Sequence, residues 1–353
     1  MTDKEWALEK NKLAEENIIL IRFKYDYFGL KMVLRVVFLL FTLIKIIKKE
    51  KISVIHAWCT PAGAIGYLLS IITSKPLIID SYEPHAESMV ENGTWSRSNF
   101  KFKILFWLEK KQSQKAKTVI ALTKGMKEYA KTKYNATFTN YYVKPALVNL
   151  DQFKWNIDLY EKRRKKQNLD GKIVCVYAGK LGGIYLNEEV FDFFKVASDF
   201  WGEKLQIFLL TDKNIDEVNT LIQQKNIPSN CIKTLFVPFK EIHNYYQIAD
   251  FAINPVKPVP SKKYCTSIKD GEYWAMGLPI VITKNISDDS KIIEEEDIGY
   301  VLKKLTSDEY NNACIKIQNL IKDKRLIHQK IRAIATKYRN FEIANEIYKK
   351  IYN

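Results

Sequence analysis

The sequence predicts an α/β protein made of two Rossmann-like, doubly wound domains with a helical C-terminal tail. Three observations support this prediction. The chain has 353 residues, more than a single hydrophobic core usually serves. Short apolar runs alternate with longer helical patterns, as expected for parallel sheets covered on both faces. The alternation stops at a highly charged stretch near the middle of the chain and then starts again.

Five apolar runs in the first half predict the strands of one parallel sheet. They lie at residues 18–23, 54–57, 77–79, 119–122 and 141–143. The segments between them are long enough for crossover helices, most clearly at residues 30–48 and 100–117. Residues 1–150 are therefore predicted to form the N-terminal domain.

The charged stretch at residues 151–172 includes the run Glu-Lys-Arg-Arg-Lys-Lys-Gln. Such a run is typical of a solvated linker or helix face, so the domain boundary is predicted here. Six further apolar runs follow, at residues 173–178, 206–210, 234–237, 251–254, 279–282 and 300–302. They predict a second doubly wound domain over residues 173–330. The tail is helical by pattern, and residues 331–353 are expected to pack back toward the first domain.

The composition points to an anionic partner. With 56 basic and 40 acidic residues, the formal net charge is +16. Phosphorylated substrates and an anionic membrane surface both fit this excess. Nucleic acid is not expected, because no arginine-rich repeat, zinc-finger spacing or RNA-binding signature accompanies it. The five cysteines are scattered and odd in number, and the N-terminus lacks the apolar core of a signal peptide, so a cytoplasmic protein without disulfides or structural zinc is expected.

The segment from Tyr27 to Lys51 has the most membrane-like sequence. Its nine-residue stretch between Arg35 and Lys45, residues 36–44, covers only about 14 Å as a helix, against roughly 30 Å of hydrocarbon. Basic residues at helical spacing give the helix one polar stripe beside a wide apolar face. Two interpretations remain open: a core helix with a solvated basic edge, or a helix that contacts an anionic membrane surface.

Ligands of open parallel sheets bind beyond the carboxyl ends of the strands, and two such ends in the second half carry phosphate-binding features. The first is a glycine-rich turn after residues 173–178, with Gly182 and Gly183 to let backbone approach a phosphate and Lys180 to add charge. A plain strand-to-helix turn explains this pattern equally well. The second begins at Ser267, whose spacing to Asp270 predicts a capping box.

The helix that Ser267 begins should present Lys269 and Glu272 near its start. A carboxylate there can accept hydrogen bonds from the vicinal hydroxyls of a ribose, while lysine and free amides face a phosphate. Gly277 is expected to end the helix and Pro279 to open the next strand. The alternative is a capped amphipathic helix in which Glu272 has no ligand.

A third polar cluster follows the run at residues 77–79 and contains Asp80, Glu83, His85 and Glu87. These groups could hydrogen-bond a hydroxylated acceptor or serve as acid and base groups, and His56 should emerge on the same edge of the sheet. No spacing among them is diagnostic of a metal site. A capped helix start is the alternative for Glu83 and Glu87.

On these residues the sequence resembles the retaining GT-B glycosyltransferases of bacterial cell-surface polysaccharide synthesis. The likeness spans nearly the whole chain and is carried by residues 55–57, 80–87, 119–124, 177–179, 249–250 and, above all, 267–279. It implies transfer of a sugar from a nucleotide sugar to a glycan or lipid-linked acceptor at the inner face of the membrane. It also implies an interdomain site with neither metal nor cofactor.

The resemblance assigns the donor to the second domain. It implies that Glu272 binds the ribose, that Lys269 and the Gly182–Gly183 turn, with Lys180, bind the diphosphate, and that residues 236–239 bind the base. Its donor-site residues are thus Lys180, Gly182, Gly183, Phe239, Ser267, Lys269 and Glu272. The candidate catalytic residues, which would face the acceptor and the reacting sugar, are His85, Asp80 and Glu83.

Two departures from the family pattern stand out. The fuller motif has a second glutamate eight positions before the ribose one, and here that position is Tyr264. The usual first strand and its glycine-rich loop are not found ahead of residues 18–23, so the first domain is predicted to be incomplete. This leaves two alternatives to a glycosyltransferase: a non-catalytic subunit that completes a partner enzyme, and a nucleotide-sugar epimerase.

Overall fold

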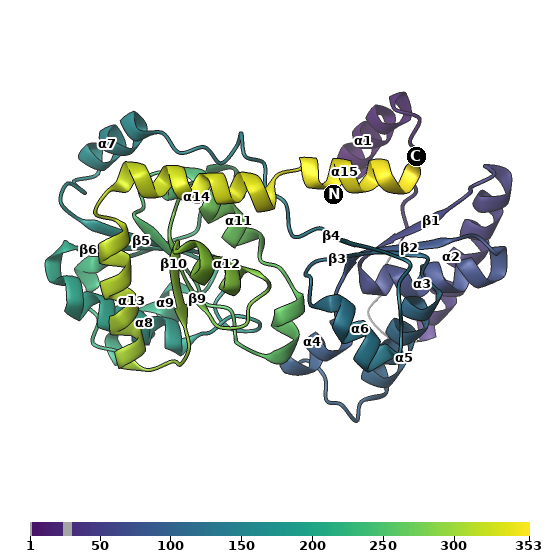
Figure 1. The fold of residues 1–353 in the computed structure, drawn as a ribbon, viewed down its shortest axis with the longest axis horizontal. Coiled ribbons are helices and arrows are strands. Elements are labelled where there is room, and N and C mark those ends of the chain that lie inside the picture. Colours follow the sequence, from purple (N-terminus) through teal and green to yellow (C-terminus); the bar gives the residue numbers. More distant parts are fainter. Residues whose placement is uncertain (1, 24–29) are drawn as a thin grey trace.

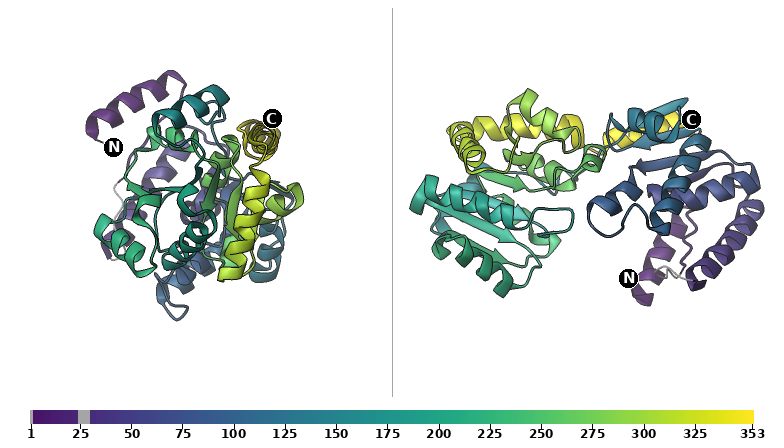
Figure 2. Two further views of the ribbon diagram at one scale, coloured as in Figure 1. Left: turned by 90° about the vertical axis from the view of Figure 1, so that its left-hand side faces the viewer. Right: turned by 90° about the horizontal axis from the view of Figure 1, so that it is seen from below.

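The computed structural model describes residues 2–23 and 30–353 and confirms the predicted fold class. Two α/β domains stand side by side, and the C-terminal helices run across both of them (Figure 1). Each domain contains its own parallel sheet, and further views show helices on both faces of the two sheets (Figure 2).

The first domain has a four-stranded sheet in the described part of the chain, in the order β1-β2-β3-β4. All three pairings are parallel. The strands are β1 (Ile55–Trp58), β2 (Leu77–Tyr82), β3 (Thr118–Ala121) and β4 (Asn140–Val143). The helices are α1 (Asp3–Glu15), α2 (Leu30–Lys49), α3 (Cys59–Thr73), α4 (His85–Glu91), α5 (Phe100–Lys115) and α6 (Met126–Tyr134). Four of the five predicted strands and both predicted helices are present, with ends shifted by a few residues.

The strand predicted at residues 18–23 is wrong. These residues form no strand, and Ile19 is 66% exposed. No described strand pairs with the outer edge of β1, so this apolar run has no sheet position to occupy. An apolar run without a partner strand cannot satisfy its backbone hydrogen bonds as a sheet does.

Helix α2 is apolar on two sides. Its inner side contacts α3, whereas Phe38, 75% exposed, lies on the other side with Val33, Leu34, Val37 and Phe41, which are also exposed. The core-helix interpretation therefore describes only the inner side. Within the described ranges no helix is both long and apolar enough to cross a membrane. Tyr27, where the predicted segment begins, lies outside the described residues.

The second domain has a six-stranded sheet in the order β10-β9-β8-β5-β6-β7, parallel throughout. The strands are β5 (Ile173–Ala178), β6 (Leu205–Leu210), β7 (Ile232–Leu235), β8 (Phe251–Asn254), β9 (Ile280–Thr283) and β10 (Gly299–Leu302). The helices around it are α8 (Glu188–Trp201), α9 (Ile215–Gln224), α10 (His243–Tyr246), α11 (Ile268–Ala275), α12 (Asp289–Glu296) and α13 (Ser307–Leu320). Strand β7 starts earlier than predicted because Ile232 pairs with Ile207 of β6.

The charged stretch is more than a solvated linker. It contains α7 (Ile157–Lys166), and Arg164 of this helix is buried, where it donates to the carboxylate of Asp250 and to the carbonyl oxygen of Ile248. The other cations of the run stay at least partly exposed. Helix α7 is thereby fastened to the second domain.

The tail forms α14 (Lys324–Arg339) and α15 (Glu342–Tyr352). The predicted boundary at residue 330 falls inside α14, which packs along α11 of the second domain. Helix α15 returns to the first domain, where Ile347 packs against Ile78 and Ile120 on one face of the sheet. Figure 1 shows the two yellow helices end to end, with α14 over the second domain and α15 over the first.

Candidate active site

The start of α11 lies at the carboxyl end of β8. Ser267 occupies the N-cap position, as predicted, but its side chain makes no capping hydrogen bond. Instead, Asn254 at the end of β8 donates to the hydroxyl of Ser267 at 2.9 Å and to the carboxylate of Asp270 at 2.6 Å. The predicted capping box is therefore wrong, because the side chains of Ser267 and Asp270 both accept hydrogen bonds from Asn254 instead. Gly277 follows the helix with φ +73°, as expected of a helix-ending glycine.

Lys269, in the first turn of α11, reaches the glycine-rich turn that follows β5. Its ammonium lies 3.7 Å from the centre of the Tyr185 ring. A Cβ at Gly179 would overlap the Lys269 side chain, and Gly179 has φ +149°, a conformation that other residues rarely adopt. Burial lowers the pKa of Lys269 to about 8, against the opposing charges of Asp270 and Glu272. The structure thus brings the predicted lysine onto the predicted turn.

Glu272 lies one turn further along α11 and is only 4% exposed. The hydroxyl of Tyr246 donates to its carboxylate at 3.3 Å. Burial raises the pKa of Glu272 to about 7, although the Tyr246 hydrogen bond and the Lys269 charge both act to lower it. A carboxyl group with so few protein partners can exchange its proton or accept hydroxyl hydrogen bonds near neutral pH.

The glycine-rich turn carries the other predicted phosphate contacts. Gly182 and Gly183 have φ of +80° and +63°, and a Cβ on either would meet no neighbouring atom. Their left-handed backbone, rather than crowding, accounts for glycine here. Lys180 is exposed, and the hydroxyl of Tyr177 donates to its carbonyl oxygen.

Phe239, predicted to contact the base, is 55% exposed and lies beyond β7. Its ring meets that of Phe153 edge-on, with centroids 6.1 Å apart, and Phe153 in turn stacks with Tyr246. A row of rings therefore links Phe239 to the hydrogen-bond donor of Glu272. Sequence reasoning missed Phe153, Tyr185 and Tyr246, because isolated aromatic residues carry no spacing signal.

Glu83 and His85 lie together at the end of β2, where α4 begins. Nδ1 of His85 is 3.5 Å from the Glu83 carboxylate. This contact raises the pKa of His85, and burial opposes the rise. For Glu83 burial acts to raise the pKa, but the hydrogen bonds from His85 and Cys265 outweigh it and the net shift is downward. The pair therefore favours its ionised form.

Asp80, the third predicted catalytic residue, belongs to a separate buried network. Its Oδ2 accepts from Lys144 at 2.8 Å and from Tyr348 of α15 at 2.6 Å, and lies 3.3 Å from Nε2 of His56. Burial acts to raise the pKa of Asp80, yet the hydrogen bonds from His56, Lys144 and Tyr348 lower it overall. These contacts serve to fasten α15, so the structure groups Asp80 with His56 and apart from the Glu83–His85 pair.

The carboxyl ends of the two sheets meet where the segment Pro260–Tyr264 of the second domain docks on α4. The hydroxyl of Ser88 donates to that of Ser261 at 3.0 Å. Tyr264, at the position where the sequence resemblance would place a glutamate, packs on Tyr129 of the first domain with ring centroids 4.7 Å apart. Lys262 is buried and close enough to affect the pKa of both Glu83 and His85. The second domain thus adds a cation beside the first-domain pair.

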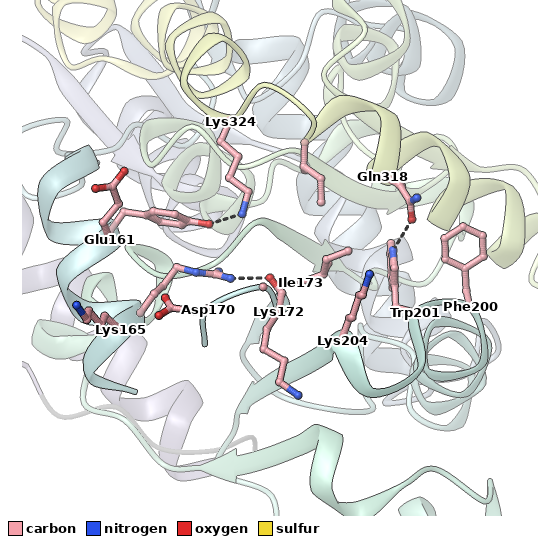
Figure 3. Close-up of a pocket in the computed structure, with 14 residues that line it drawn as sticks. Glu161, Lys165, Asp170, Lys172, Ile173, Phe200, Trp201, Lys204, Gln318 and Lys324 are labelled. Atoms are coloured by element: carbon pink, nitrogen blue, oxygen red, sulfur yellow. Dashed lines mark hydrogen bonds between the residues drawn. The ribbon is translucent and has the colours of Figure 1, made fainter. Parts of the chain in front are cut away.

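A cavity of about 750 Å³ lies elsewhere, at the amino ends of the second sheet (Figure 3). Three residues of its wall contact the buried Asp250 behind them: Arg164 and Tyr160 donate to its carboxylate, and Nζ of Lys324 lies 2.6 Å from it. Arg164 also donates to the carbonyl oxygens of Leu169 and Lys172. These cations are engaged by protein acceptors, so the wall serves to join α7 and α14 to the sheet. Among residues 2–23 and 30–353, no group of three or more His, Cys, Asp or Glu residues is arranged to hold a metal ion.

Residues 6–152 match the model of a protein family described as Glycosyltransferase Family 4. No curated protein sequence matches the chain. Among solved structures, HepE from Anabaena in complex with UDP is similar, with 15% identity, coverage of 97% of this chain and 88% of that chain, and a TM-score of 0.75. A glycosyltransferase from Rickettsia africae has 17% identity, coverage of 97% and 87%, and a TM-score of 0.69. Sucrose-phosphate synthase from Thermosynechococcus elongatus has 17% identity, coverage of 95% and 83%, and a TM-score of 0.69. These likenesses show the GT-B fold over nearly the whole chain.

Proposed function

We propose that this GT-B chain is a glycosyltransferase that passes a sugar from a nucleotide sugar to a glycan or lipid-linked acceptor in cell-surface polysaccharide synthesis. The observation that carries the proposal is the placement of Lys269 and Glu272 on one helix start, against the turn at Gly179. The family match of residues 6–152 supports the same activity. HepE, crystallised with UDP and with UDP-glucose, supports a uridine nucleotide as the first donor to try.

The donor would lie along the carboxyl ends of the second sheet. Glu272 would accept hydrogen bonds from the ribose hydroxyls, and Phe239 would pack against the base. Lys269 and the amides around Gly182 and Gly183 would hold the diphosphate and stabilise its charge as the bond to the sugar breaks. Retention of configuration and catalysis without metal or other cofactor belong to the proposal, on the strength of the sequence resemblance.

The acceptor would meet the sugar at the Glu83–His85 pair. His85 can donate a hydrogen bond to a substrate oxygen, and Glu83 keeps the imidazole protonated. Asp80 has a positioning part in this proposal, because its carboxylate is occupied by Lys144 and Tyr348.

Ligand binding tests the proposal before any acceptor is known. Thermal unfolding should be followed with UDP, GDP, ADP and CMP and with their sugars, because a ligand at about 100 times its Kd adds roughly 2.7 kcal/mol of stability. One nucleotide should raise the Tm, and Glu272→Gln should weaken its binding in calorimetry. Glu294→Gln, an exposed change on α12, is the matched control. No binding of any nucleoside diphosphate would overturn the donor site.

We further propose that the enzyme acts as a peripheral protein at the inner face of the membrane. The exposed apolar side of α2, which includes Phe38 and Phe41, would enter the lipid interface, and its basic residues would face anionic headgroups.

A second candidate, a subunit completed by a partner, is favoured by the outer edge of β1. That edge has no partner strand in the described part of the chain, and unpaired edges accept strands from other chains. Co-purification with a partner protein, together with transfer activity in the complex and none in the isolated chain, would favour this candidate. A monomer with full activity would exclude it.

A further inference from the structure

Glu109 of α5 is a carboxylate with 0% exposure beneath the turn that carries His85. Its Oε1 accepts from the backbone amide of Ala86 at 2.8 Å, and its Oε2 accepts from the hydroxyl of Tyr134 at 2.7 Å. Oε1 therefore bonds to the residue next to His85, and Oε2 bonds to the last residue of α6. Neither the sequence motifs nor the donor site accounts for this group.

Burying a carboxylate is costly, and an apolar side chain would fill the same space without the cost. Burial raises the pKa of Glu109 to about 7, while the bonds from Tyr134 and Ala86 and the charge of His85 act to lower it. The acidic groups near it, Glu83 included, do not stabilise its charge. Its charge is thus sustained by two hydrogen bonds and by His85.

Charged groups of three elements face His85. Glu83 lies in the preceding turn, Glu109 lies on α5 of the same domain, and Lys262 reaches it from the second domain. The two carboxylates raise the pKa of His85, whereas burial and Lys262 lower it. Glu83 makes the larger contribution through its direct contact, and Glu109 adds to it from the buried side.

We propose that Glu109 is a positioning residue that holds the backbone bearing His85 through the Ala86 amide and supplies a buried negative charge to the His85 imidazolium. The role in transfer rests on the proposed function, but the coupling between the two side chains does not. A positively charged His85, held at one angle, can donate to an oxygen of the acceptor or the sugar.

Glu109→Gln separates charge from shape. The amide oxygen of glutamine can still accept from Ala86, and its amide nitrogen can donate to the Tyr134 oxygen. The pH titration of His85 should be followed by NMR; the protein has only four histidines, so His85→Gln assigns its signal. The midpoint of His85 should move to lower pH in Glu109→Gln, by on the order of half a unit. With an assay in hand, kcat should fall roughly tenfold with little change in the donor KM.

Ser113→Ala is the matched control. Ser113 is buried one turn along α5 and bonds to Tyr82 and to the Glu109 carbonyl oxygen, but not to its carboxylate. This variant should lose stability and leave the His85 midpoint unchanged. The same midpoint in wild type and Glu109→Gln would overturn the proposal, whether or not transfer activity is ever observed.

A reciprocal measurement covers the case in which Glu109→Gln does not fold. His85 is partly exposed, so His85→Gln should fold, and the Glu109 carboxyl can be followed by carbon NMR. Removing the facing cation should raise the Glu109 midpoint. An unchanged midpoint would equally overturn the coupling.

Discussion

The hydroxyl of Tyr348 donates a 2.6 Å hydrogen bond to Asp80, across 268 positions of sequence. The same carboxylate oxygen accepts from Lys144. Together these contacts tie the last helix of the chain to the end of β2. A few polar contacts and a small apolar patch therefore hold α15 on the first domain.

Tyr348→Phe should lower the free energy of unfolding by about 1–2 kcal/mol, because the buried Asp80 carboxylate loses a donor. Urea unfolding measures this loss as a lower midpoint. Tyr352→Phe, on an exposed ring of the same helix, should cost less. Equal midpoints for Tyr348→Phe and wild type would mean that Lys144 and His56 satisfy the Asp80 carboxylate without Tyr348.

Nucleotide affinity should pass through a maximum between about pH 7 and about pH 8. Glu272 has a pKa of about 7, so affinity should rise with pH as its carboxylate ionises to accept ribose hydroxyls. Lys269 has a pKa of about 8, so affinity should fall again as its ammonium loses the proton that faces the diphosphate. Calorimetry across this range measures both limbs. Glu272→Gln should flatten the acid limb and Lys269→Met the alkaline one; two unchanged limbs would contradict the assignment.

Gly179→Ala should abolish nucleotide binding and cost roughly 1–3 kcal/mol of stability, because alanine is strained at φ +149° and its Cβ overlaps Lys269. Gly93→Ala is a useful comparison, since its φ of +82° is strained but nothing lies within 4 Å of an added Cβ. Both variants should lose stability, and only Gly179→Ala should lose the ligand. Retained nucleotide binding in Gly179→Ala would show that binding does not require the contact between Lys269 and the turn.

Phe38→Ser combined with Phe41→Ser should reduce sedimentation with anionic lipid vesicles several-fold, because about 25 cal/mol of transfer free energy is lost per Å² of apolar surface. Leu326→Ser, an exposed apolar change on α14 of the second domain, should have no effect. Added salt should weaken wild-type binding if the basic residues of α2 contribute. Equal vesicle binding by the double variant and wild type would refute the interfacial role of α2.

Local patterns were enough to predict much of the fold. Apolar runs located ten of the strands, and Ser267 and Gly277 correctly marked the ends of α11. The run at residues 18–23 failed because a strand needs a neighbour as well as an apolar pattern, and none of the described strands provides one. Strand β7 was displaced for the related reason that its register depends on pairing with β6.

Pairwise contacts between distant residues were beyond prediction. Asp80 was grouped with His85 because both follow the apolar run at residues 77–79, yet its carboxylate is bonded to Tyr348, near the other end of the sequence. Asn254, at the end of β8, donates to Asp270 and so replaces the predicted capping box. Arg164, predicted to be solvated, donates to the buried Asp250. The hydrogen-bond partner of a polar side chain depends on which groups lie near it in the folded chain, and the spacing of residues within one segment does not contain that information.

The chain passes between the domains twice, once after β4 and once between α14 and α15, and both passages meet at Arg339. Its carbonyl oxygen accepts from the amide of Val148 at 2.8 Å, and its buried guanidinium donates to the carbonyl oxygen of Ala146 at 3.1 Å. In Figure 1 this junction lies at the top, and α4 lies at the bottom of the boundary. Arg339 thus joins the two passages of the chain at one end of the domain boundary, and the Ser88–Ser261 hydrogen bond joins the domains at the other end.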